Sequence, residues 1–105
     1  MIYFLFRPFY TLSNAMLVDA AIDGDILVIL ALVDTVNVNR GQTMLNANGT
    51  FDAVTPLWGA AWQGHLAIVK LLVANGAIVD ARVRGTTPFW IAAASNNLDV
   101  AIFLA

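Results

Sequence analysis

Few side chains in this sequence could act as catalysts, and they do not fall in a catalytic pattern. The 105 residues include one histidine, His65, no cysteine and seven acidic residues, all of them aspartate. Catalysis that needs a histidine or a thiolate would therefore have to pass through His65 alone. Ser13 and Ser95 have no sequence neighbour that resembles an activating base. We predict that the protein is not an enzyme.

Metal and phosphate sites are not indicated by the sequence either. Asp23-Gly24-Asp25 has part of the composition of a calcium loop, but the spaced oxygen ligands and the terminal glutamate are missing. Gly64 and Gly76, like Gly24, stand where a helix is expected to end, which explains them without a phosphate-binding loop. We expect no cofactor and no small-molecule substrate.

The stretch 55–77 predicts two short helices joined by a tight turn. The hydroxyl of Thr55 can cap the first helix, and Pro56 suits its first position. Gly64 can end that helix by adopting a left-handed backbone. The second helix should end at 75–76, and its apolar side chains share one face. These side chains are Ile68, Val69, Leu71 and Leu72.

The same pattern recurs on both sides of this stretch. The Thr-Pro pair at 55–56 returns at 87–88, an offset of 87 − 55 = 32 residues. The alanine pair at 60–61 has counterparts at 20–21 and 92–93. Neither helix of the stretch is long enough to be stable alone in water, so we expect the units to pack against one another.

Two adjacent positions keep the same chemistry in each unit. The first ends the first helix with a residue that tolerates left-handed backbone, and the second has a side-chain atom that can accept a hydrogen bond from the start of the second helix. We therefore expect the second residue to be a helix cap. The pairs are Gly24-Asp25, Gly64-His65 and Asn96-Asn97.

A period near 33 with a Thr-Pro-Leu opening, an alanine pair, Gly-His and a closing Gly-Ala resembles the ankyrin repeat. The resemblance implies an all-α repeat fold (α-solenoid) of helix-turn-helix units joined by β-hairpin fingers. It treats residues 1–105 as one domain. The expected parts are an N-terminal arm (1–13), a degenerate capping repeat (14–40), an extended hairpin insertion (41–49), a central repeat (50–81) and a truncated third repeat (82–105).

Two features depart from the family pattern. Trp58 and Trp90 stand where the family usually has histidine, and we expect both to pack between repeats. The extra residues before the central repeat include Asn48-Gly49, the strongest hairpin signal in the chain. Asn48-Gly49-Thr50 also fits the glycosylation acceptor pattern, but the turn explains these residues without a sugar. Gly85 is placed for a tight turn in the next finger.

The resemblance implies binding of a partner protein of unknown identity through the finger tips and the exposed side of the first helices, which line a concave face. Trp62 is the expected anchor, because the scaffold could use a small or polar residue there. The alternative is that Trp62 packs against Trp58 or a neighbouring finger. In the first unit only Ile22 and Asp23 can be placed on this face. The expected partner-binding residues are Phe51, Asp52, Val54, Trp62, Gln63, Arg84, Thr86 and Ser95.

Composition leaves two further readings open. The chain is 60% hydrophobic and 11% charged, which favours a piece of a longer ankyrin scaffold, or self-association through an uncovered C-terminal helix. A peripheral membrane protein could use Met1–Phe6 and Ile26–Val33, but basic residues that assist such binding are few. Flanking aspartates argue against a membrane-spanning helix at 26–33.

A net charge of −2 without a basic cluster gives no reason to expect nucleic-acid binding, and we expect a cytoplasmic location.

Overall fold

Helices follow one another in three pairs along the chain. The computed structural model describes residues 14–33, 37–39, 42–45 and 51–105. Within these ranges the first pair is α2 (Asn14–Asp23) and α3 (Ile26–Leu32), the second is α4 (Pro56–Gln63) and α5 (Leu66–Ala74), and the third is α6 (Pro88–Ala94) and α7 (Leu98–Leu104). The predicted all-α repeat class is confirmed.

Local sequence explains where the central and third pairs begin. The hydroxyl oxygens of Thr55 and Thr87 each accept a hydrogen bond of 3.2 Å, from the backbone nitrogens of Trp58 and Trp90. A proline follows each threonine at the start of its helix. Both predicted caps are confirmed, and together they fix the angle at which the chain enters α4 and α6.

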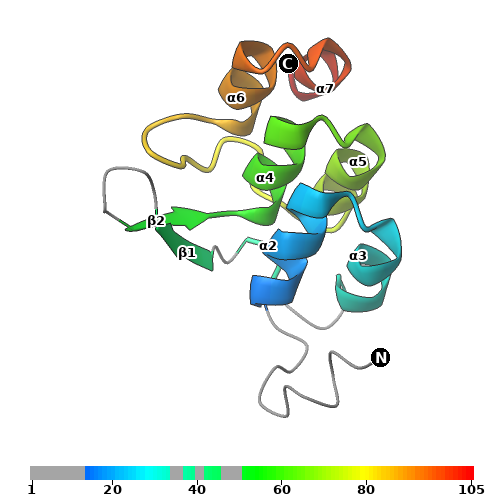
Figure 1. Ribbon diagram of the computed structural model, residues 1–105. Helices are drawn as coiled ribbons and strands as arrows, with labels where there is room; N and C mark the ends of the chain where they lie inside the picture. The colour runs from blue at the N-terminus through cyan, green and yellow to red at the C-terminus, as the bar shows by residue number, and fades with distance from the viewer. Residues whose placement is uncertain (1–13, 34–36, 40–41, 46–50) are drawn as a thin grey trace.

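The helices form two rows, with the strands on one side. In Figure 1, α2, α4 and α6 are stacked from bottom to top, α3, α5 and α7 lie to their right, and β1, β2 and the loop before α6 extend to the left. The first helices approach closely because small residues separate them: the alanine pairs at 20–21 and 60–61 are buried, as is Ala92. One apolar core runs through all three pairs.

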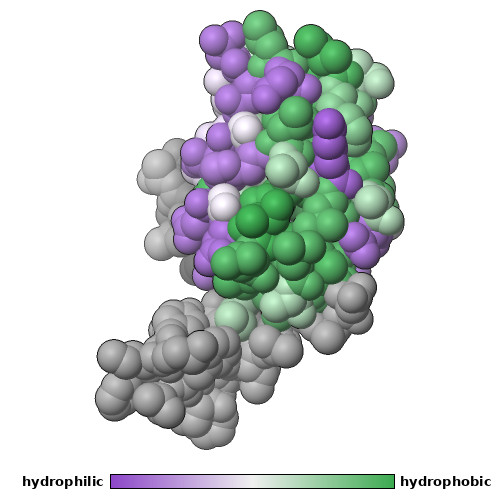
Figure 2. Space-filling view, turned by 90° about the vertical axis from the view of Figure 1, so that its right-hand side faces the viewer, coloured by the Kyte–Doolittle hydropathy of each residue, from purple (hydrophilic) through white to green (hydrophobic). Residues whose placement is uncertain are grey.

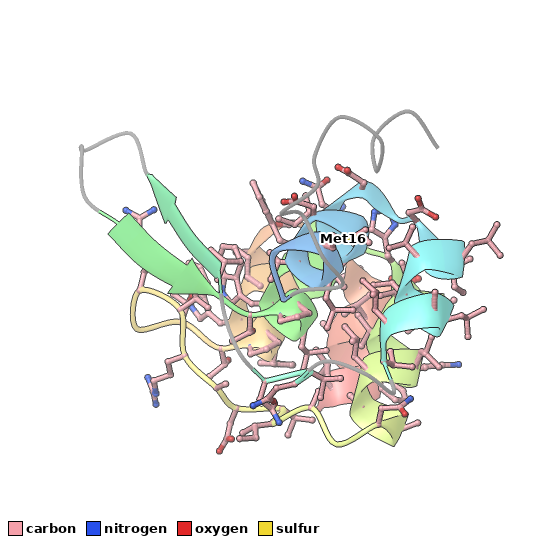
Figure 3. The ribbon with its side chains drawn as sticks, turned by 90° about the horizontal axis from the view of Figure 1, so that it is seen from below. Met16 is labelled. Carbon is pink, nitrogen blue, oxygen red and sulfur yellow. The ribbon has the colours of Figure 1, made fainter. Side chains whose placement is uncertain are left out.

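The connections between pairs reach away from the helices. Strands β1 (Gln42–Leu45) and β2 (Phe51–Val54) pair antiparallel, with Gln42 opposite Val54. Seen from the α2–α3 end in Figure 3, this pair extends away from the helices, and α2, with the half-buried Met16, lies between it and α3. The predicted turn at 48–49, its glycosylation site and the predicted N-terminal arm (1–13) lie outside the described residues.

The second connection makes a tight turn before α6. Val83 and Thr86 bond to each other through their backbones, with N···O distances of 2.8 and 3.0 Å. The two residues between them, Arg84 and Gly85, both have positive φ, at 55° and 79°. Two successive positive φ values are the geometry of a type I′ turn, and glycine at the second position relieves part of its strain.

His65 and Asn97 are the N-cap residues of α5 and α7, but neither side chain accepts a capping hydrogen bond, so that expectation is wrong for both. Only Asp25 caps as expected, accepting from the backbone nitrogen of Val28 at 3.4 Å. Nε2 of His65 instead lies 3.0 Å from the carbonyl oxygen of Ile22, at the end of the preceding first helix. Because a carbonyl oxygen accepts, Nε2 carries the proton. The side chain therefore joins two helix pairs.

Asn97 makes the same link one pair later. Its Nδ2 donates to the carbonyl oxygens of Ala61 and Trp62, at 3.0 and 2.8 Å. These carbonyls stand at the end of α4. That of Ala61 also accepts from the backbone nitrogen of Gly64 at 3.3 Å, whereas that of Trp62 belongs to the last turn, which leaves carbonyls without an intrahelical donor. An aspartate could not replace this amide, since an ionised carboxylate only accepts. The two cross-links hold α2, α4 and α6 in register at one end.

The glycines that end α2 and α4 make room for these links. Gly24 and Gly64 have φ of 81° and 79°, as the predicted helix stops require. A Cβ on Gly24 would lie 2.7 Å from Cε1 of His65, and a Cβ on Gly64 would lie 2.6 Å from Oδ1 of Asn97. Each glycine thus allows both a left-handed backbone and the close approach of the next pair.

We expect Gly64→Ala to lower the free energy of unfolding by about 2 to 4 kcal/mol, the sum of left-handed strain and overpacking against Asn97. Gly85→Ala is the matched control, because Gly85 has the same φ but a Cβ there would meet nothing within 4 Å. It should cost only the strain, about 1 to 2 kcal/mol. Urea unfolding of both variants measures the difference. Equal losses would show that the contact with Asn97 contributes nothing.

Candidate functional site

A second, smaller apolar cluster packs the two connections between helix pairs against the first helices. These connections, called the fingers below, are β1–β2 and the loop before α6. Its buried members are Val18 of α2, Val54 of β2 and Val83 of the loop before α6, and Ile22 and Trp58 pack against it. One residue from each of three separate segments therefore meets beneath Trp58. This cluster determines how the fingers stand relative to the helices.

Trp58 is held in place by a hydrogen bond as well as by packing. Its indole Nε1 donates to the hydroxyl oxygen of Thr86 at 3.0 Å, and that hydroxyl donates to the carbonyl oxygen of Val83 at 2.7 Å. The ring of a central-pair tryptophan is thus tied to the connection that leads into the next pair. The predicted packing of Trp58 between repeats is confirmed.

Trp62 is both exposed, as an anchor for a partner would be, and packed against Trp58. The sequence had left these two alternatives open. Its side chain is 42% exposed, and its ring also stands against Trp58, with centroids 5.7 Å apart and planes tilted by 43°. Its carbonyl oxygen is bonded by Asn97. Backbone and ring are therefore both held, while much of the side chain remains exposed to solvent. Such a side chain loses little freedom when a partner covers it.

The other predicted partner-binding residues differ in accessibility. Val54 is only 7% exposed, so it supports the fingers from inside. Gln63 is exposed at the end of α4, and Arg84 is exposed in the tight turn. Thr86 and Ser95 are half-buried. Phe51 and Asp52 belong to β2, and their side chains lie outside the described residues.

Trp90 does not pack between helix pairs, so that prediction is wrong. It is 54% exposed, because the described part of the chain has no helix pair beyond the third to cover it. Phe89 beside it is exposed as well, whereas its counterpart Leu57 in the central pair is buried. The same position is thus part of the core in one unit and part of the surface in the next.

Side chains that could do chemistry are dispersed over the described structure. His65, the only histidine, is occupied by the carbonyl of Ile22. Within the described ranges, no three histidine or acidic side chains gather closely enough to hold a metal ion. What the described surface offers instead is an exposed, firmly placed aromatic ring, which suits recognition of another molecule.

Comparison with protein families agrees with this architecture. The family model for ankyrin repeats, in three copies, matches residues 17–105. The chain belongs to the ankyrin-repeat family. Ankyrin repeats are generally protein–protein interaction modules, and the family is typically non-enzymatic. A search of curated proteins gave no significant match.

The second helices of this ankyrin array carry exposed apolar side chains. Leu27 of α3 is 75% exposed and Ile102 of α7 is 76% exposed. Figure 2 shows this side of the molecule, and apolar side chains gather on it. Lys70 of α5 lies with Nζ 5.7 Å from the centre of the Phe103 ring. Among the described helices, none combines the length and the hydrophobicity that crossing a bilayer requires.

The sequence did not predict that Asn97 positions Trp62 by donating a hydrogen bond to its backbone carbonyl. The signal was present, because His65 and Asn97 occupy the same repeat position and both can donate a hydrogen bond. A cap and a cross-link use the same residue types, however. Only the distance from the side chain to the carbonyls at the end of the preceding first helix distinguishes a cross-link from a cap.

Proposed function

We propose that this ankyrin array binds a partner protein, without catalysis, through the face formed by the fingers and the exposed side of α2, α4 and α6. Trp62 is its anchor, and the face also includes Gln63 and Ser95 at the helix ends and Arg84 and Thr86 in the second finger. Phe51 and Asp52 belong to this face by their repeat position. Val54 supports the face from the core.

The observation that carries this proposal is that Trp62 is exposed although its backbone and ring are both held. A large apolar ring in water is costly to leave uncovered, and a rotating side chain would lose entropy on binding. Trp58 and Asn97 have already restricted Trp62. Tryptophans in such positions are enriched among the residues that contribute most to interface affinity.

The test is affinity capture with the wild-type chain and with Trp62→Ala as matched baits, followed by titration of each captured protein. We expect Trp62→Ala to weaken a true partner by about 2 kcal/mol, or roughly thirtyfold, because the anchor is lost. Leu27→Ala is the control, since it removes an even more exposed apolar side chain from the opposite row of helices. It should leave the affinity unchanged.

Circular dichroism and thermal unfolding should show that both variants keep the helix content of the wild type. If Trp62→Ala and wild type bind every captured protein with the same affinity, Trp62 is not the anchor and the proposed face is wrong.

Self-association is a second candidate function, favoured by the exposed side chains of α7. Ile102, Leu98 and Phe103 give this helix an apolar surface that the described structure leaves open. Two copies could cover these surfaces by packing α7 against α7. Light scattering should then show a mass that rises with concentration above 11.3 kDa, and Ile102→Lys should abolish the rise. A monomer at high concentration would contradict this candidate.

A further inference from the structure

The ends of the first helices carry an uneven distribution of charge. In α2, α4 and α6 the only charged residues are Asp19 and Asp23, both on α2. Asp23 is the last residue of α2 and is exposed. Its counterpart in the central pair is Gln63, next to Trp62. The row of helix ends therefore has a carboxylate at one end, an exposed aromatic ring beside it, and no positive charge.

The cross-links between helix pairs bring Asp23 and Trp62 to the same corner. His65 bonds the carbonyl of Ile22, the residue before Asp23, and so aligns the ends of α2 and α4. Asn97 bonds the carbonyl of Trp62 at the same level of α4. Packed helix axes lie about 8 to 10 Å apart, so one extended side chain can contact groups on both helices.

The basic residues of the described structure belong to other segments of the chain. Lys70 belongs to the second row of helices, over Phe103. Arg82 donates from Nη1 to the carbonyl oxygen of Gly85 at 3.0 Å, within the second finger, and Arg84 lies in the same turn. Trp62 is six residues beyond Pro56 and thus about 9 Å further along the axis of α4, away from the fingers. Within the described structure, the helices α2, α4 and α6 therefore supply no cation to this corner.

We propose that the corner formed by Asp23, Trp62 and Gln63 binds an arginine side chain of the partner protein. This inference rests on the proposed function and names the chemistry of its central contact. The guanidinium plane stacks on the exposed surface of the Trp62 indole, where the negative face of the ring attracts a cation. Its N–H groups donate to the carboxylate of Asp23 and to the side-chain oxygen of Gln63.

Arginine fits this corner better than lysine does. A guanidinium is planar, weakly hydrated and forked, so it can stack on a ring and donate to a carboxylate at once. A lysine ammonium is a compact charge that holds its water more strongly and cannot stack. Anionic ligands such as nucleic-acid phosphates or acidic lipid headgroups would meet the carboxylate of Asp23 without a compensating cation, so the corner disfavours them.

The experiment titrates the full chain with short peptides of alternating glycine and arginine, glycine and lysine, or glycine and glutamine, by calorimetry and tryptophan fluorescence. The arginine peptide should bind about tenfold more tightly than the glutamine peptide, with lysine between them. Trp62→Ala should remove about tenfold of the affinity for the arginine peptide. Asp23→Asn should remove about threefold, and added salt should reduce this share.

Asp80→Asn is the matched control for charge, because it removes one exposed carboxylate outside the first helices, and it should leave the affinity unchanged. The inference is overturned if the arginine peptide fails to bind, if the glutamine peptide binds equally well, or if Trp62→Ala binds the arginine peptide as tightly as the wild type does. The proposal that the array binds a partner protein through Trp62 is tested separately. It is contradicted only if the captured proteins bind wild type and Trp62→Ala with equal affinity.

Discussion

The hydrogen bonds that each helix pair sends back to the end of the preceding first helix hold the array together. Short helices such as α4 and α6 cannot persist alone, so their stability comes from packing against neighbours. Apolar burial brings the pairs together but does not set their register. The side chains of His65 and Asn97 do so, because each donates to a carbonyl in the last turn of the preceding first helix, that of Ile22 or that of Trp62, where the helix leaves carbonyls without a donor. Gly24 and Gly64 provide the necessary space.

The same links explain why a binding surface can exist on so small a scaffold. Asn97 bonds the carbonyl of Trp62, and Thr86, in the connection to the third pair, bonds the indole of Trp58, on which Trp62 stands. Trp62 is thus positioned from the third pair, although it belongs to the central one. A substitution that loosens the contact between pairs would disturb the anchor without touching it. Stability and recognition are coupled in this array through the same few side chains.

Local chemistry made much of the fold predictable from sequence. Thr55 and Thr87 cap their helices, and Gly64 ends one, because these effects depend on residues a few positions apart. The cross-links made by His65 and Asn97 could not be inferred in this way, because their partners are distant in sequence. The partner of His65 is 43 residues away, and those of Asn97 are 35 and 36 residues away. Trp90 was expected to pack like Trp58, yet no described helix pair covers it. The exposure of a side chain depends on which helix pair packs next to its own, and the sequence of one repeat does not contain that information.

The most direct test of this account is a double-mutant cycle between Gly64→Ala and Asn97→Ala, measured by urea unfolding. If the Asn97 side chain fills the space above Gly64, truncating it removes the overpacking that an alanine at 64 creates. The double variant should then lose less free energy of unfolding than the sum of the two single losses, by about 1 kcal/mol or more. Losses that add within about 0.5 kcal/mol would contradict the claim that this contact sets the register of the array.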